Sequence, residues 1–198
     1  MGHVLSINVG MVAPLRVGSV GSAQSVMSAI CKAPVSGSVA VNRLGIVGDE
    51  RADMSVHGGL DKAIYLYPRE HYAFWAAARE RFLHTSLPLP WGTLGENLTT
   101  DGLLEDDLWV GDRLVIGDLL LEVTEPRAPC YKFAAHMGFA QAVRHMLQSG
   151  FTGVYLKVVT PAVLSAGERI CILPGLREVS IASINAQRLR GRQRDLFS

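Results

Sequence analysis

The heptapeptide PRAPCYK at residues 126–132 combines one cysteine with two prolines and two basic residues. Prolines fix φ and lack an N–H donor, so they hold this segment rigid and outside regular helix. A cation near a thiol favours the thiolate, the form of cysteine that attacks an electrophile or ligates a metal, and Arg127 and Lys132 flank Cys130. A free cysteine is also often a small buried hydrophobic residue. The residue types alone leave both interpretations open.

A second polar segment, GIVGDERADMSVHGGLDKA at residues 45–63, contains the adjacent glycines Gly58 and Gly59, followed by Lys62. Adjacent glycines let backbone N–H groups approach a ligand closely, and a cation after them can hold an anion. The same residues also suit a polar loop that only turns the chain into the next strand. Spacing alone does not separate a binding loop from a connecting loop.

A third segment, WGTLGENLTTDG at residues 91–102, sets Glu96 and Asn97 between glycines. The pattern is typical of an ordinary loop with an Asx-type turn. Its carboxylate and amide groups could also orient a ligand. Read by itself, this segment favours the ordinary loop.

The elements that must position these segments are mostly short apolar runs separated by turn residues, which is typical of strands. Gly117-Asp118 joins two of these runs as a tight hairpin. The pattern predicts a mainly β fold: an antiparallel-rich sheet that curls or closes into a β-barrel, with a few helices around it. Strands are expected at 3–10, 38–45, 62–68, 113–123, 153–159 and 169–173, and helices at 69–84, at 139–149 and from near residue 180.

The chain organisation expected is a barrel domain over residues 1–178 and a short helix with a basic tail over 179–198. The tail carries four arginines, which are typical of a solvated, frayed terminus rather than of a nucleic-acid site. A net charge of +1 also argues against wholesale nucleic-acid or membrane binding. The sequence contains no apolar run near the ~20 residues of a membrane span and no signal-peptide pattern.

The cysteines are Cys31, Cys130 and Cys171, an odd number without a Cys-x-x-Cys pair. This usage fits a reducing cytoplasm rather than a disulfide framework. Three thiolates cannot hold an all-cysteine iron–sulfur cluster, which needs four. Cys31 and Cys171 are expected to be structural; Cys171 lies within the apolar run RICIL.

The three polar segments, in this order, resemble the MOSC family, named for the C-terminal domain of molybdenum-cofactor sulfurases, and within it the stand-alone bacterial proteins of the YiiM type. The matching motifs are His-Gly-Gly-x-Asp-Lys, Gly-Glu-Asn and Pro-Cys-Tyr-Lys, and the likeness covers most of residues 38–160. The resemblance implies a β-barrel with a few surrounding helices. It also implies chemistry with the molybdenum cofactor, a molybdopterin.

In the family, the cysteine that matches Cys130 is regarded as the metal-binding or sulfur-carrying residue, so the resemblance implies Cys130 as molybdenum ligand. His57 and Asp61 then become candidates for proton delivery or for shaping the loop, and Glu96 and Asn97 for orienting cofactor or substrate. The phosphate of the pterin implies an anion site. The residues expected to contribute to it are Gly58, Gly59, Lys62, Arg127 and Lys132.

The resemblance further implies reduction of small N-hydroxylated compounds, such as hydroxylaminopurine-like bases, as a detoxification. With no iron–sulfur cluster in the chain, electrons would come from a separate donor protein. Pyridoxal phosphate is not expected, because it belongs to a different domain of the sulfurases. Larger members hold the cofactor with an extra N-terminal domain for which 198 residues leave no room, so binding of the cofactor is expected to be weaker or to depend on a partner, and the cofactor can be lost on purification. Whether the protein is a homodimer is left open.

Two other functions are compatible with the same residues. The first is a metal-free thiol enzyme with Cys130 as nucleophile and His57 as base, which requires the two side chains to lie within hydrogen-bond reach. The second is a carrier without turnover, which binds the cofactor or ferries sulfur on Cys130. The resemblance favours the reductase over the thiol enzyme and hardly separates it from the carrier.

Overall fold

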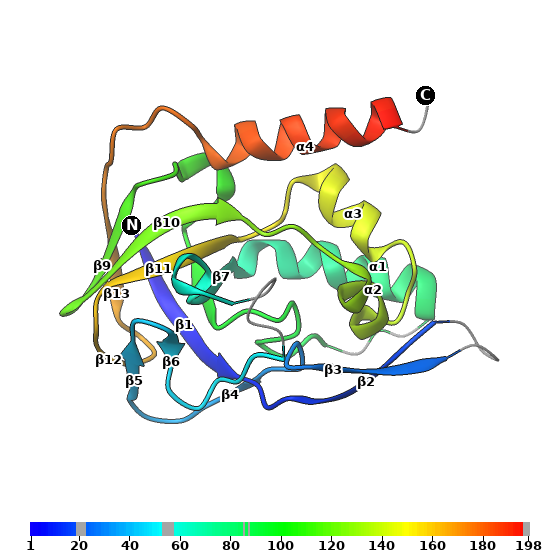
Figure 1. Cartoon of the computed structure of the whole chain (residues 1–198), viewed down its shortest axis with the longest axis horizontal. Coiled ribbons are helices and arrows are strands. Elements are labelled where there is room, and N and C mark those ends of the chain that lie inside the picture. Colours follow the sequence, from blue (N-terminus) through cyan, green and yellow to red (C-terminus); the bar gives the residue numbers. More distant parts are fainter. Residues whose placement is uncertain (19–22, 53–57, 85, 87, 196–198) are drawn as a thin grey trace.

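The structure, a computed structural model, describes residues 1–18, 23–52, 58–84, 86 and 88–195. Within these residues, seven strands form a closed barrel, whose arrangement can be followed in Figure 1. The barrel closes because the strands at the two ends of its order, β13 and β1, pair with each other. All pairings in it are antiparallel except β7–β8, which is parallel. The order is β13 (Arg169–Leu173), β9 (Arg113–Ile116), β10 (Leu119–Pro126), β11 (Val154–Thr160), β7 (Ile64–Pro68), β8 (Leu98–Asp101) and β1 (Gly2–Val9), and β4 (Ala33–Pro34) adds to β1.

Alternation of side chains along the strands fills the barrel interior. On β10, Leu119, Leu121 and Val123 are buried while the residues between them are partly exposed, as expected when successive side chains point to opposite faces. Full burial of such a side chain contributes about 1.5–3 kcal/mol to folding. The β9–β10 turn is the predicted hairpin: Gly117 has φ 56°, a conformation that favours glycine at the first position of a type II′ turn.

A second core lies outside the barrel, between β7 and three helices. Every residue of β7 is buried, because one face of this strand packs in the barrel and the other packs against the helices. Trp75, Phe133 and Met146 are the helical residues at the centre of this second core. The helices are α1 (Tyr72–Leu83), preceded by a 3₁₀ turn η2 (Arg69–His71), α2 (Tyr131–Met137) and α3 (Ala142–Ser149).

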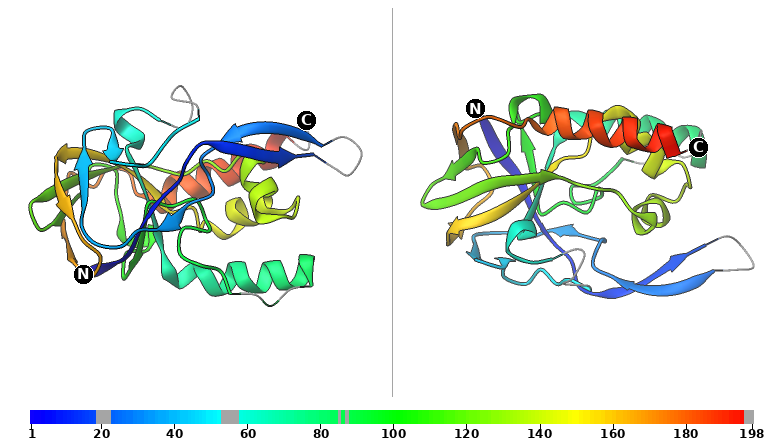
Figure 2. Two further views of the ribbon diagram at one scale, coloured as in Figure 1. Left: turned by 90° about the horizontal axis from the view of Figure 1, so that it is seen from below. Right: turned by 45° about the horizontal axis from the view of Figure 1, so that its top comes forward.

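A two-stranded ribbon and a C-terminal helix complete the structure. The ribbon reaches beyond the barrel in both further views (Figure 2), and helix α2 packs against its first strand. Helix α4 contacts α3 and β10. The ribbon consists of β2 (Ala13–Val17) and β3 (Gln24–Ser28), and α4 spans Ile181–Asp195. A separate small sheet consists of β5 (Val39–Asn42), β6 (Gly45–Ile46) and β12 (Ala162–Leu164). Two further 3₁₀ turns are η1 (Leu60–Lys62) and η3 (Glu105–Asp107).

The mainly β barrel with surrounding helices confirms the fold class predicted from the sequence. The ribbon, strand β8 and helix α2 were not predicted. The C-terminal helix is also longer than expected, since it runs through the arginine-rich segment to Asp195. Within the described residues, no helix has the length and apolar character needed to cross a membrane.

Candidate functional site

A basic pocket lies between the ribbon end, helix α2 and the outward-facing tyrosines of β7 and β11. Its cavity volume is about 100 Å³. Five basic side chains and two acidic ones line it together with the Cys130 thiol, so the pocket suits an anionic ligand. The basic residues are Lys32, Arg51, Lys62, Arg127 and Lys132, and the acidic residues are Asp49 and Glu50.

Cys130 is the residue immediately before helix α2 and is partly buried. Its backbone is extended, with φ −123° and ψ 176°, and its carbonyl accepts the Phe133 N–H at 3.0 Å. The preceding proline explains why no helix begins earlier. The chain thus presents the thiol on a fixed backbone at the wall of the pocket.

Arg127 provides a fixed positive charge in the same pocket. Its side chain is buried, and Nη1 donates a hydrogen bond to the Leu94 carbonyl. Burial by itself would lower the pKa of Arg127, but Tyr65, Tyr155 and Cys130 raise it, and the net shift is upward. Arg127 therefore stays protonated throughout the physiological range.

Lys32 and Asp49 form a buried ion pair in the pocket wall, with side-chain exposures of 8% and 2%. Burial lowers the pKa of Lys32, and the Asp49 carboxylate opposes that shift. Asp49 also accepts the Gly10 N–H at 2.9 Å and the Asn97 side-chain N–H at 2.9 Å. This carboxylate joins three chain segments around the pocket.

Asn97 and Glu96, adjacent in sequence, have different environments. Asn97 lines the pocket, and its Oδ1 accepts the Tyr65 N–H at 3.1 Å. Glu96 is fully buried away from the lining, where its carboxylate accepts hydrogen bonds from the Tyr72 hydroxyl and the Leu94 N–H, among others. Glu96 therefore orders the loop before β8, while Asn97 faces the pocket.

The glycine segment at residues 45–63 contributes to the described lining through residues 49–52 and through Lys62. Lys62 lines the pocket, and its Nζ lies 3.3 Å from the Glu125 carboxylate. Gly58, Gly59 and Asp61 are outside that lining as the described residues define it, and Asp61 is exposed. His57 lies outside the residues that the structure describes.

The sequence-predicted residues that the structure brings together are therefore Cys130, Lys62, Asn97, Arg127 and Lys132. Lys132 also donates to the Met27 carbonyl at 3.2 Å and so joins α2 to the ribbon. Sequence reasoning missed further lining residues. Among them, Arg51 and Tyr65 lie in or shortly after the glycine segment but are not part of its motif, and Lys32 and Tyr155 come from distant parts of the chain.

The remaining thiols are not packed as expected, since Cys31 and Cys171 are both exposed. Cys171 occupies an outward-facing position of β13, whose residues alternate between exposed and buried at its start. The apolar run around it reflects a strand with one solvated face. Cys31 follows the ribbon and contacts His136.

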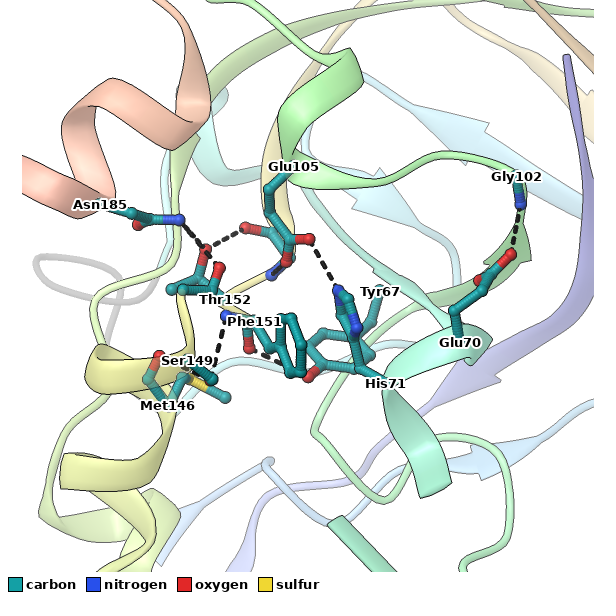
Figure 3. Close-up of polar contacts among 12 residues, drawn as sticks. Tyr67, Glu70, His71, Gly102, Glu105, Met146, Ser149, Phe151, Thr152 and Asn185 are labelled. Atoms are coloured by element: carbon teal, nitrogen blue, oxygen red, sulfur yellow. Dashed lines mark hydrogen bonds and ion pairs between the residues drawn. The ribbon is translucent and has the colours of Figure 1, made fainter. Parts of the chain in front are cut away.

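A separate buried polar cluster joins α4 to the barrel (Figure 3). His71 Nε2 lies 2.8 Å from the Glu105 carboxylate, whose other oxygen accepts the Gly153 N–H at 2.7 Å. Asn185 of α4 donates to the Thr152 hydroxyl at 3.0 Å. These groups satisfy one another, so the cluster fixes the position of α4.

Comparison with known proteins gives a consistent result. A family model described as MOSC domain matches residues 53–171. The chain is 36% identical over 154 residues to Protein YiiM of Escherichia coli, covering 78% of this chain and 67% of that protein. It is 36% identical over 183 residues to the uncharacterized protein YflK of Bacillus subtilis, covering 92% and 78%.

One more distant relative and one solved structure extend this picture. A protein of Gibberella moniliformis named Reductase is 31% identical over 175 residues, covering 87% of this chain and 29% of that protein. The crystal structure of YiiM from Geobacillus stearothermophilus has a TM-score of 0.74 and 33% identity, covering 97% of this chain and 86% of that chain. The region that matches the family model includes Cys130 and Arg127 and leaves Lys32 N-terminal to it.

Proposed function

The chain belongs to the MOSC domain family, and we propose on this basis that it binds the molybdenum cofactor in the basic pocket, with Cys130 as the molybdenum ligand, and reduces small N-hydroxylated compounds. The observation that carries the proposal is the sharing of one pocket by Cys130 and five basic side chains. The relative named Reductase supports an oxidoreductase.

The residues of the pocket fit such a group. A thiolate is a soft ligand suited to a thiophilic metal, and the pterin part of the cofactor carries a phosphate. Arg127 is buried, charged and fixed, so it can bind phosphate with its planar set of N–H donors. Lys62 and Lys132 add positive charge to the same pocket.

The proposed reaction breaks the N–O bond of a hydroxylamine and consumes two electrons and two protons, giving the amine and water. When bound, the molybdenum centre supplies the two-electron chemistry. A separate donor protein supplies the electrons. Burial raises the pKa of Tyr155, so its phenol stays protonated and can donate a hydrogen bond to substrate. The family motif also makes His57 and Asp61 candidates for proton delivery and Gly58 and Gly59 candidates for backbone donors, although Gly58, Gly59 and Asp61 lie outside the described lining.

The test is molybdenum and pterin analysis of full-length protein purified without oxygen from a host that makes the cofactor. Wild type is compared with Cys130→Ala, and Cys171→Ala serves as the matched control because this thiol is exposed on β13. We expect molybdenum and pterin near one per chain in wild type and in the control, and loss of both in Cys130→Ala. Loaded protein should then reduce 6-N-hydroxylaminopurine with a reduced viologen dye.

If neither group binds wild type under conditions that load a control molybdoenzyme, the proposed mechanism fails for this chain. If the cofactor binds but no reduction occurs with any donor, the carrier function replaces the reductase. A thermal melt of each variant separates loss of binding from loss of fold.

A further inference from the structure

A second thiol outside the Cys130 pocket contacts a histidine base. The Sγ atom of Cys31 lies 3.3 Å from Nδ1 of His136, which belongs to helix α2. The other ring nitrogen, Nε2, lies 2.9 Å from the Thr93 carbonyl oxygen. A carbonyl only accepts hydrogen bonds, so Nε2 must carry the proton. Nδ1 is then the lone-pair nitrogen that faces the thiol.

The charges around the pair keep it neutral at rest. Burial lowers the pKa of His136; the Thr93 carbonyl opposes this shift, and Arg127 and Arg79 of α1 add to it. The Cys31 residue is exposed, but partial burial of its thiol raises the thiol pKa. The resting pair is therefore a thiol that donates its S–H to an unprotonated imidazole.

This arrangement contains the parts of an activated nucleophile: a thiol, a base within reach and a third group that orients the base. Cys31 is exposed, so a small electrophile can reach it. Thr93 acts as the positioning residue because its carbonyl fixes the tautomer and the ring orientation.

We propose that Cys31 and His136 form a reactive thiol site whose substrate class is the low-molecular-weight disulfides. His136 Nδ1 takes the Sγ proton as Sγ attacks one sulfur of the disulfide. The Sγ–S bond forms and the S–S bond of the reagent breaks. Cys31 is oxidised to a mixed disulfide, and the departing half is reduced to a thiolate, which receives the proton from His136.

The site is independent of the molybdenum proposal, since no step involves the cofactor. It nevertheless lies next to the basic pocket, because Ile30 and Lys32, on either side of Cys31, both line it. A group attached to Cys31 would therefore alter the segment that holds one wall of the pocket.

The test measures the rate at which single thiols react with 4,4′-dithiodipyridine at pH 7, followed by release of thiopyridone. Cys130→Ser/Cys171→Ser leaves Cys31 as the reacting thiol, and Cys31→Ser/Cys130→Ser leaves Cys171, the exposed reference thiol on β13. General-base catalysis contributes factors of about 100 or more in enzymes. We expect Cys31 to react at least about tenfold faster than Cys171.

His136→Gln is the decisive variant because glutamine keeps an N–H donor for the Thr93 carbonyl but has no basic nitrogen. In the Cys31-only background it should lower the rate about tenfold or more, with no change in the Cys171-only background. A Cys31 rate no higher than that of Cys171, or a rate unaffected by His136→Gln, would overturn the proposal.

The pH dependence tests the same pair without altering His136. A thiol without a base reacts only as its thiolate, so an unassisted rate rises by up to about tenfold for each pH unit. Because the pKa of His136 is lowered, its imidazole is already unprotonated over this range. The Cys31 rate should therefore rise less than about threefold if His136 is the base. A tenfold rise for Cys31 would overturn the proposal even if His136→Gln fails to fold.

Discussion

The guanidinium carbon of Arg127 lies 4.8 Å from the centre of the Tyr65 ring, in the wall of the basic pocket. The same carbon lies 4.9 Å from the centre of the Phe133 ring. Cation–π contacts of this kind are strongest where the charge is desolvated, and Arg127 is buried. The protein thus holds a permanent positive charge in one orientation before any anion arrives.

Arg127→Lys tests whether the planar group, rather than the charge alone, is required. Lysine keeps the charge but loses the ring contacts and the fixed hydrogen bond to Leu94. We expect the free energy of unfolding in urea to fall by about 1–3 kcal/mol. Arg81→Lys is the control, because Arg81 also lies over a ring, Phe82, but is exposed. Equal stability of Arg127→Lys and wild type would contradict this account.

Lys32→Met tests the buried ion pair with Asp49. Removal of one partner leaves an uncompensated buried charge, so the free energy of unfolding should fall by about 3–5 kcal/mol. Arg113→Met is the control. It breaks the ion pair between Arg113 and Glu122, whose Nε and Oε2 atoms lie 3.2 Å apart and in which the arginine side chain is half exposed. Such a pair contributes about 0–1 kcal/mol. Similar losses for the two variants would show that burial of the Lys32 pair has little energetic effect.

The barrel could be predicted because its signals are local. Alternating residues along β10 and the Gly117 turn depend only on neighbours in the chain. The ribbon could not be predicted, since its apolar strand residues are at most half-buried and Ser28 is its one buried strand residue, so its sequence carries only a weak alternation. Helix α2 has only seven residues and follows a proline segment, so no helical period could develop.

The site residues that belong to sequence motifs could be predicted. Those that the fold brings in from other parts of the chain could not. Arg127 and Lys132 flank Cys130 in sequence, so their proximity is visible in the sequence itself. Lys32 reaches the pocket only because the ribbon returns beside α2, and Tyr155 only because β11 pairs with β7. The side chain of Glu96 turns inward because four hydrogen-bond donors converge on it, which neighbouring residue types do not reveal.

Arg188→Ala tests how α4 supports the segment before Cys130. Arg188 Nη1 donates to the Pro126 carbonyl at 2.7 Å, and Nη2 lies 3.3 Å from Glu125, the residue that also pairs with Lys62. We expect a loss of about 1 kcal/mol in the free energy of unfolding. Arg190→Ala, two residues on and exposed, should change it by less than about 0.5 kcal/mol. Equal effects of the two variants would mean that Arg188 does not hold this segment.

Glu96→Gln tests the buried carboxylate. Glutamine presents an NH2 group, which cannot accept a hydrogen bond, where the Glu96 carboxyl, protonated or ionised, has an oxygen that can, so a buried donor such as the Leu94 N–H loses its acceptor. At pH 5 we expect a loss of about 1–3 kcal/mol in the free energy of unfolding. Glu80→Gln on exposed α1 surface is the control and should have little effect at any pH.

The effect of Glu96→Gln should also depend on pH, in a defined direction. Burial raises the pKa of Glu96 above its ordinary value of 4.5, although hydrogen bonds from Tyr72 and Thr99 oppose this. Between the unfolded-state pKa of 4.5 and the raised folded-state pKa, the folded state binds more protons than the unfolded state. Glu96 therefore stabilises the folded state fully below pH 4.5, and this stabilisation is lost as the pH rises through the folded-state pKa. Glutamine does not titrate, so the stability difference between wild type and Glu96→Gln should narrow as pH rises. Urea unfolding from pH 4 to pH 8 measures this stability difference. If the difference widens as pH rises, the hydrogen-bond donors around Glu96 lower its pKa more than burial raises it, and the folded-state pKa lies below 4.5.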